Sequence, residues 1–199
     1  MPVFEEEDIK LAEEIHEAYN DDNVHVVLVK GFYDDDKIVD VIAAATELND
    51  DPKIMLRTGH LKNAQDLLQR AFSHYSKSIK VSFTSNKPFV VNRKNIHVDK
   101  WNQNNYYPIH GDISIYYPIQ SVIAEGGEND LKKLRTAISN DNSKLIVLVT
   151  TNDVKESYLD FSLLADIVDK SFVLDSSKKY PDLYSTVLNN LKVDKIHYE

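Results

Sequence analysis

The stretch VHVVLVK, residues 24–30, decides the fold class. It is short, β-branched and apolar at nearly every position, which is the pattern of a strand buried on both faces. Such strands occur mainly in parallel sheets, where helices cover both sides. A second apolar strand of this kind, KLIVLVTT, occupies residues 144–151. Together the two strands predict a parallel sheet between two layers of helices.

Helical and strand patterns alternate around these two strands. Helices are predicted at 5–19, 37–48, 61–75, 129–139, 157–168 and 181–192, and further strands at 53–58, 112–118 and 171–175. The alternation breaks at residues 79–109, where three strand-like pieces (79–83, 88–91 and 96–98) follow one another without a helix. We therefore predict a single α/β domain over residues 1–199. It has a three-layer, doubly wound, mostly parallel sheet, Rossmann-like or degenerate P-loop-like, with a basic, antiparallel β excursion inserted at about 77–110.

The composition limits the class of protein. The chain has 199 residues, 42% of them hydrophobic, and no cysteine, which suits one globular domain and excludes disulfides and thiolate chemistry. No apolar run reaches the roughly 18–20 residues of a membrane span. The first residues, MPVFEEEDIK, lack the basic and apolar regions of a secretory signal. We expect a cytoplasmic protein with no membrane partner.

Charge is distributed unevenly along the chain. The net charge of −9 argues against indiscriminate coating of nucleic acid. Between Lys77 and His110, however, six basic residues and one acid give a charge of about +5, which leaves −14 for the remainder. Basic side chains can follow phosphates, and exposed aromatic rings can stack on unpaired bases. The predicted nucleic-acid-binding residues are Lys87, Arg93, Lys94, Lys100, Trp101 and Tyr106. In the alternative interpretation, the aromatic residues fold into the core and the lysines keep an edge strand soluble.

The acid-rich turn GFYDDDKI, residues 31–38, stands where many α/β proteins have a phosphate-binding loop. Gly31 and Lys37 have the spacing of the P-loop pattern GxxxxGK[ST], but Asp36 and Ile38 replace the second glycine and the hydroxyl residue. The strand LIVLVTTND resembles the sensor strand of P-loop ATPases, and the resemblance gives Thr151 and Asn152 the nucleotide-contacting positions. The neighbouring strand SIYYPIQ lacks the acidic pair of that family. We expect a nucleotide-like loop that does not hydrolyse ATP.

A catalytic interpretation uses the acids of the same sheet edge. Asp34, Asp36 and His60 are its candidate catalytic residues, and oxygen ligands for Mg²⁺ come from Asp36, Asp153 and Asp175. His60 and Lys62 approach the HxK pattern of phospholipase D-like phosphodiesterases, although Asp66 falls one residue short of that family's spacing. The alternative is that Asp34 or Asp35 caps the following helix and that the other acids complement its dipole.

Three functions follow from these observations. The first is an accessory or regulatory domain that binds nucleic acid, or another phosphate-bearing partner, through residues 77–110. The second is a metal-dependent, nuclease-like phosphoester hydrolase, the one case in which Mg²⁺ is required. The third is a non-catalytic scaffold that binds another protein.

Overall fold

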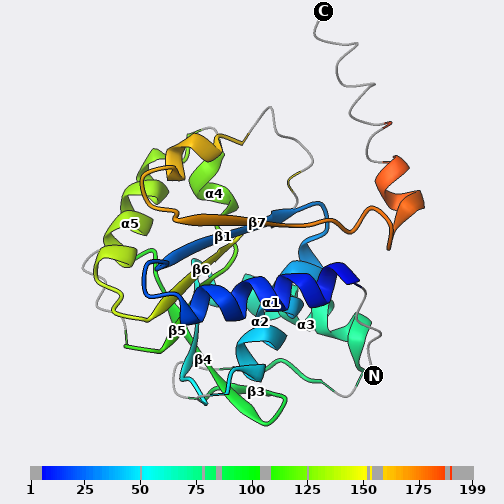
Figure 1. Ribbon diagram of the computed structural model, residues 1–199, viewed down its shortest axis with the longest axis horizontal. Helices are drawn as coiled ribbons and strands as arrows, with labels where there is room; N and C mark the ends of the chain where they lie inside the picture. Colours follow the sequence, from blue (N-terminus) through cyan, green and yellow to red (C-terminus); the bar gives the residue numbers. More distant parts are fainter. Residues whose placement is uncertain are drawn as a thin grey trace, which may run out of the picture.

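Seven strands form one sheet among the residues that the computed structural model describes, which are 6–49, 51–77, 79–83, 87–103, 109–124, 126–151, 153, 159–186 and 189. Their order across the sheet is β3-β4-β2-β5-β6-β1-β7 (Figure 1). The strands are β1 (Val26–Gly31), β2 (Ile54–Thr58), β3 (Phe89–Val91), β4 (Lys94–Lys100), β5 (Ile113–Tyr116), β6 (Leu145–Val149) and β7 (Lys170–Leu174). Every neighbouring pair is parallel except β3 and β4. The predicted, mostly parallel sheet is confirmed.

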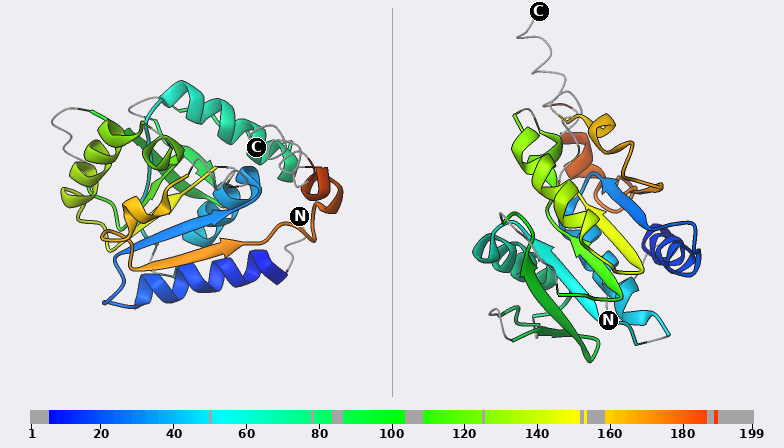
Figure 2. Two further views of the ribbon diagram at one scale, coloured as in Figure 1. Left: turned by 90° about the horizontal axis from the view of Figure 1, so that it is seen from above. Right: turned by 90° about the vertical axis from the view of Figure 1, so that its left-hand side faces the viewer.

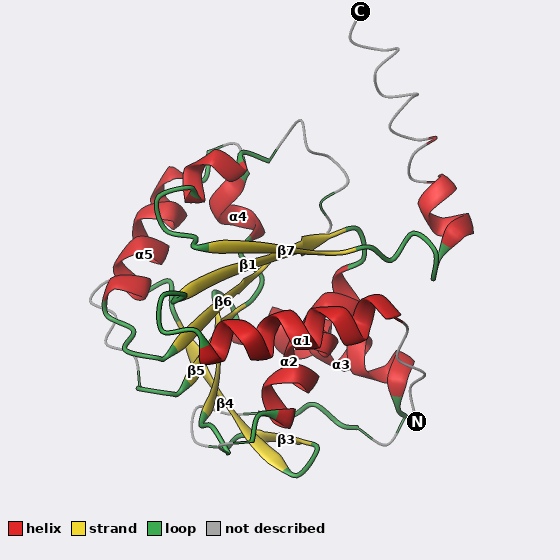
Figure 3. Cartoon of the chain, viewed as in Figure 1, coloured by secondary structure: helices red, strands yellow, loops and turns green. Residues whose placement is uncertain are grey.

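Helices cover both faces of this twisted sheet, as the views in Figures 2 and 3 show. One core cluster joins the sheet to α1 (Glu6–Asn20), α2 (Asp34–Glu47) and α3 (Leu61–Tyr75). The other joins it to α4 (Gln120–Ile123), α5 (Glu128–Ser139) and the 3₁₀ turn η2 (Phe161–Leu164). The fold is therefore the predicted three-layer α/β sandwich.

The packing of β1 explains why its sequence is apolar at nearly every position. Val27 and Val29 pack in the cluster of α1, α2 and α3, whereas Val26 and Leu28 pack in the cluster of α4 and α5. Because successive side chains of a strand point to opposite faces, a strand between two helical layers has no polar face. All four side chains are buried.

The strand order determines which loops meet the end of β1. Numbered along the chain, the six parallel strands run 3-2-4-5-1-6 across the sheet, whereas the Rossmann order is 3-2-1-4-5-6. The first strand here lies between the last two. The loop after β1 consequently lies beside the loops that follow β6 and β7.

The basic segment is joined to the main sheet more closely than the sequence indicated. β4 pairs in parallel with β2, so that only β3 is antiparallel. Asn92 and Arg93, with φ of 48° and 68°, form the two-residue turn between β3 and β4, since tight hairpin turns require positive φ. We refer to residues 89–100 as the basic hairpin.

The predicted strand at 79–83 is wrong. The Gln69 side chain accepts a hydrogen bond from the backbone N–H of Val81, at 2.8 Å, and donates one to the carbonyl of Ile79, at 3.2 Å. These bonds take the place of strand pairing, and the segment is a loop. Of the helix predicted at 157–168, residues 157 and 158 lie outside the described part, and residues 161–164 form a 3₁₀ turn. No helix in the described parts of the chain has the length and apolar character needed to cross a membrane.

Candidate functional site

The turn after β1 begins at a glycine that has no room for a side chain. Gly31 has a φ of 144°, and a Cβ built on it would lie 2.3 Å from the carbonyl oxygen of Leu174 in β7. The positive φ and this close approach both require glycine. The first residue of the nucleotide-like loop is therefore packed against a neighbouring strand.

Lys37, in the first turn of α2, is fully buried. Its ammonium group donates hydrogen bonds to the carbonyl oxygens of Gly31, at 2.5 Å, and of Thr151. It also donates to Oγ1 of Thr150 at 3.1 Å and lies 3.5 Å from Oδ2 of Asp153. Four oxygen atoms of the chain thus lie around this ammonium group.

Asp153 is the anionic partner of that lysine. Its Oδ2 accepts hydrogen bonds from the backbone N–H of Gly31 and from Oγ1 of Thr150, both at 2.6 Å. Burial lowers the pKa of Lys37 to about 8, and the Asp153 carboxylate opposes this shift. Asn152, the other predicted nucleotide contact, lies outside the described residues.

The acids at the start of α2 do not cap it. The N-cap residue is Tyr33, and no side chain accepts a capping hydrogen bond there, so the capping prediction is wrong. The physical reason is Arg70 of α3, whose guanidinium contacts Asp35 at 2.6 Å and Asp34 at 2.9 Å. Asp34, Asp35 and Asp36 nevertheless occupy the first turn, where negative charge favours the helix dipole.

Asp36 contacts the segment that follows β7, residues 175–186, which we call the C-terminal strap. The hydroxyl of Tyr180 donates to Oδ1 of Asp36 at 3.1 Å, and Nζ of Lys179 lies 3.1 Å from Oδ2. The acid-rich turn is therefore covered by the chain itself.

The residues of the predicted catalytic and metal sites contact different partners. Asp34 contacts Arg70, Asp36 contacts the C-terminal strap, and His60 is the exposed N-cap residue of α3. Asp153 contacts Lys37, and exposed Asp175 accepts from the N–H of Ser177 in its own turn. Across the described ranges, no group of three or more acids and histidines has the arrangement of a metal site.

The basic hairpin and its flanks present charge but bury their aromatic residues. Lys87 and Arg93 are exposed, whereas Lys94 pairs with Asp51 and Lys100 is half-buried. Trp101 is only 2% exposed, and its ring lies 6.4 Å from that of Tyr116, so that it is not available to stack on a base. Phe83 and Phe89 are buried as well, whereas Tyr106 lies outside the described residues.

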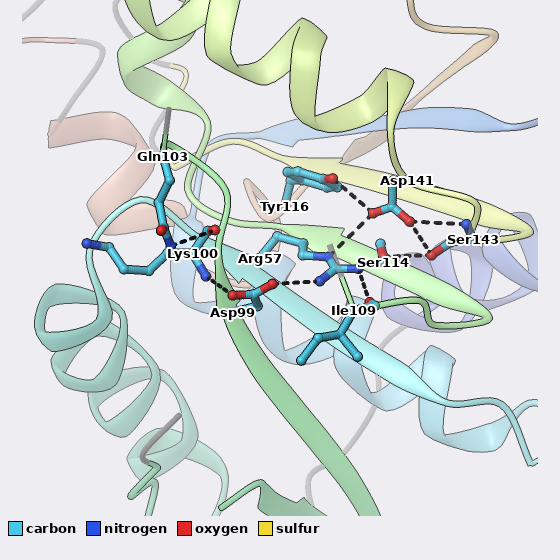
Figure 4. A network of polar contacts seen from close by, with 9 residues as sticks. All are labelled: Arg57, Asp99, Lys100, Gln103, Ile109, Ser114, Tyr116, Asp141 and Ser143. Carbon is cyan, nitrogen blue, oxygen red and sulfur yellow. Dashed lines mark hydrogen bonds and ion pairs between the residues drawn. The ribbon is translucent and has the colours of Figure 1, made fainter. Parts of the chain in front are cut away.

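A buried arginine network, which we did not predict, lies beside this segment (Figure 4). The fully buried guanidinium of Arg57 in β2 contacts Asp99 at 3.2 Å, donates to the Ile109 carbonyl at 2.7 Å and lies 3.4 Å from Asp141. The hydroxyl of Tyr116 also donates to Asp141, at 2.9 Å. Burial alone would raise the pKa of Asp141, but hydrogen bonds from Ser143 and the charge of Arg57 hold it below its usual value. The signal was an arginine directly after the apolar residues Ile54, Met55 and Leu56 in the predicted strand 53–58.

The fold is that of a three-layer α/β protein in which Lys37, Asp153 and the C-terminal strap contact the turn after β1. Comparison with protein-family models and with curated proteins found no match to this chain.

Proposed function

We propose that the chain is a non-hydrolysing, P-loop-like α/β domain that binds nucleic acid or another phosphate-bearing partner through residues 77–110, which include the basic hairpin. Lys37 stands at the position of the phosphate-loop lysine, whose role is to reach the phosphates of a nucleotide. Here its ammonium group is bound by Asp153 and by the carbonyl of Thr151. A nucleotide would have to displace these contacts, which supports a binding function without ATP hydrolysis.

The observation that carries the binding proposal is the exposure of basic side chains that have no ion-pair partner in the described structure. Lys80, Lys87 and Arg93 are exposed, and none of them has an ion-pair partner among the described residues. Some other cations of the chain have ion-pair partners, such as Arg70 with Asp34 and Asp35. Unneutralised lysine and arginine side chains are the groups that bind phosphates and release counterions.

The position of the charge supports the same function. β3 is one edge of the sheet and β7 is the other. The acid-rich turn follows β1, the neighbour of β7, whereas Arg93 lies in the hairpin turn at the β3 edge and Lys87 precedes β3. A phosphate backbone can therefore approach the basic hairpin without meeting the acids of that turn.

The test is a charge reversal with a matched control. The double variant Lys87→Glu/Arg93→Glu changes one exposed cation just before the basic hairpin and one in its turn. Lys10→Glu/Lys132→Glu makes the same change of charge at exposed positions on α1 and α5. Binding is measured by fluorescence anisotropy with labelled single- and double-stranded oligonucleotides at 50 and 200 mM salt. We expect the hairpin variant to bind about tenfold or more weakly and to show a smaller salt slope, by about one for each phosphate that it no longer binds. No binding at low salt, or an equal loss in the control, would contradict the proposal.

A further inference from the structure

The C-terminal strap is held to the rest of the chain by side chains. It leaves the end of β7 and continues into a short helix at residues 181–186, drawn in orange in Figure 1. Its backbone hydrogen bonds are internal in the described structure, from the N–H of Tyr180 to Ser176 and of Tyr184 to Tyr180. The strap can therefore leave its place without breaking a strand pairing.

Two tyrosines attach the strap to the turn after β1. The ring of Tyr180 lies 4.6 Å from that of Tyr33, and the ring of Tyr184 packs edge-on against Phe32 at 5.3 Å. Aromatic pairs at such separations attract one another beyond the apolar area they bury. The turn thus presents two aromatic side chains that fit a tyrosine-bearing segment.

One lysine of the strap enters an acidic cluster between α1 and α2. Nζ of Lys179 lies 3.2 Å from Oδ2 of Asp8 and 3.1 Å from Oδ2 of Asp36. Both aspartates are buried. Since each carboxylate comes from a different helix, a cation at this point links α1 to α2.

Asp40 provides an independent sign that this cluster accepts a cation. Its carboxyl group is 2% exposed, and neither of its oxygen atoms has a hydrogen-bond partner in the described part of the chain. Its charge interacts with those of Asp8, Asp36 and Lys179. Two buried carboxylates, those of Asp8 and Asp36, therefore share one ammonium group, and the buried carboxyl group of Asp40 lies in the same cluster.

We propose that the surface beneath the C-terminal strap is a docking site for a partner peptide in which a lysine precedes a tyrosine and a second aromatic residue follows four positions later. The strap carries this pattern as Lys179, Tyr180 and Tyr184 and occupies the site in cis. The chain's own contacts define the chemistry of the partner: one ammonium group for Asp8 and Asp36, and two aromatic rings for the turn after β1. This site is separate from the basic hairpin and does not depend on the function proposed there.

The first experiment measures whether Lys179 holds the strap. Amide hydrogen exchange is compared in the full-length protein and its Lys179→Ala and Lys178→Ala variants, because Lys178 is the exposed neighbouring lysine. In Lys179→Ala we expect exchange to become about tenfold faster or more in residues 179–186 and 32–33, with β6 unchanged. Lys178→Ala should match the wild type. Unchanged protection of the strap in Lys179→Ala would overturn the proposal, as would a uniform increase that includes β6.

The second experiment supplies the strap in trans. A fluorescent peptide with the sequence of residues 176–186, SSKKYPDLYST, is titrated into full-length wild type and into full-length Lys179→Ala. We expect the variant to bind the peptide about tenfold more tightly or more, because a tethered strap competes at a high effective concentration. A peptide with alanine in place of Lys179 should lose this binding. Equal affinity of the peptide for both proteins, or no binding to the variant, overturns the docking site.

Discussion

Buried Lys37 and partly buried Asp153 form an ion pair that joins the start of α2 to the loop after β6, with 3.5 Å between Nζ and Oδ2. Each partner also bonds to Gly31, the lysine to its carbonyl and the aspartate to its N–H. The pair therefore organises the turn after β1 from both sides. Its presence explains how the turn after β1 is stable with Lys37 turned inward.

Removal of Lys37 should destabilise the fold strongly. In Lys37→Met the Asp153 carboxylate stays buried without its counter-charge, and we expect the free energy of unfolding to fall by about 3–5 kcal/mol. Urea denaturation followed by circular dichroism measures this loss. The double variant Lys37→Met/Asp153→Leu should lose less than the two single variants together. Exposed Lys178→Met is the matched control, and an equally small effect in both lysine variants would contradict the role of the ion pair.

Nucleotide should not stabilise the protein. A ligand at a hundredfold excess over its Kd raises the free energy of unfolding by about 2.7 kcal/mol. For an ordinary nucleotide site, 1 mM ATP with Mg²⁺ is on the order of such an excess. Because Lys37 is already bound by Asp153 and Thr151, we expect this addition to leave the Tm unchanged. Thermal melts with and without Mg²⁺, and with each nucleotide, test this. A nucleotide-dependent rise in Tm that Lys37→Ala abolishes would show that the loop still binds nucleotide.

Asp40 should make the protein less stable as the pH rises from about 4 to about 8. Burial, with the neighbouring Asp8 carboxylate, raises the pKa of Asp40 to about 8 from 3.8. Between these values the folded state keeps a proton that the unfolded state has lost, so stability falls with pH by at most about 1.4 kcal/mol per unit. Below the pKa of the unfolded state, Asp40 is protonated in both states and its contribution to stability is fully present. Above the pKa of the folded state, this contribution is lost.

The measurement is urea denaturation at several pH values between 4 and 9 for the wild type and Asp40→Asn. The asparagine cannot ionise, so the variant should show a shallower decline and should be the more stable protein at pH 8. Asp22→Asn, at an exposed position on the turn after α1, is the control and should keep the wild-type decline. The same pH slope in wild type and Asp40→Asn would refute the assignment.

Arg57 should be needed to hold β4 against the loop after α5. Arg57→Met leaves the carboxylates of Asp99 and Asp141 without their shared cation, and we expect a loss of about 3–5 kcal/mol in the free energy of unfolding. Arg57→Lys keeps the charge but lacks the planar fork that reaches several acceptors, so its loss should be intermediate. Guanidinium denaturation measures both variants. Arg93→Met, at the exposed turn of the basic hairpin, should change stability by less than about 0.5 kcal/mol. If Arg57→Met were no more harmful than this control, the network would have no structural role.

Secondary structure was the feature of the fold that short-range sequence patterns predicted best. α3 begins and ends at the predicted residues, Leu61 and Tyr75, because its apolar side chains recur at helical spacing throughout. The strand at 79–83 was mispredicted because Val81 and Phe83 are buried without strand pairing, while the Gln69 side chain bonds the backbone of Ile79 and Val81. Sequence pattern indicates burial, but it does not show which group takes up the backbone hydrogen bonds.

The candidate site was predicted less well than the fold. The sequence placed Gly31, Lys37 and the aspartates at one sheet edge, and the structure has them near that edge. It could not show that Asp153 would pair with Lys37, because 116 residues separate them along the chain. Nor could it show that Arg70 would draw Asp34 and Asp35 away from capping, since this contact depends on how α3 packs against α2.

The sequence by itself determined that this chain forms a parallel sheet between two helical layers, because β1 and β6 are too apolar to have a solvent-facing side. It also determined that positive charge concentrates in one segment of an acidic chain. Only the tertiary structure decided the strand order, the pairing of each buried charge and the covering of the acid-rich turn by the C-terminal strap. The physical reason is that hydrophobic periodicity is a local property, whereas a buried charge is neutralised by whichever residue the packed fold brings within contact distance.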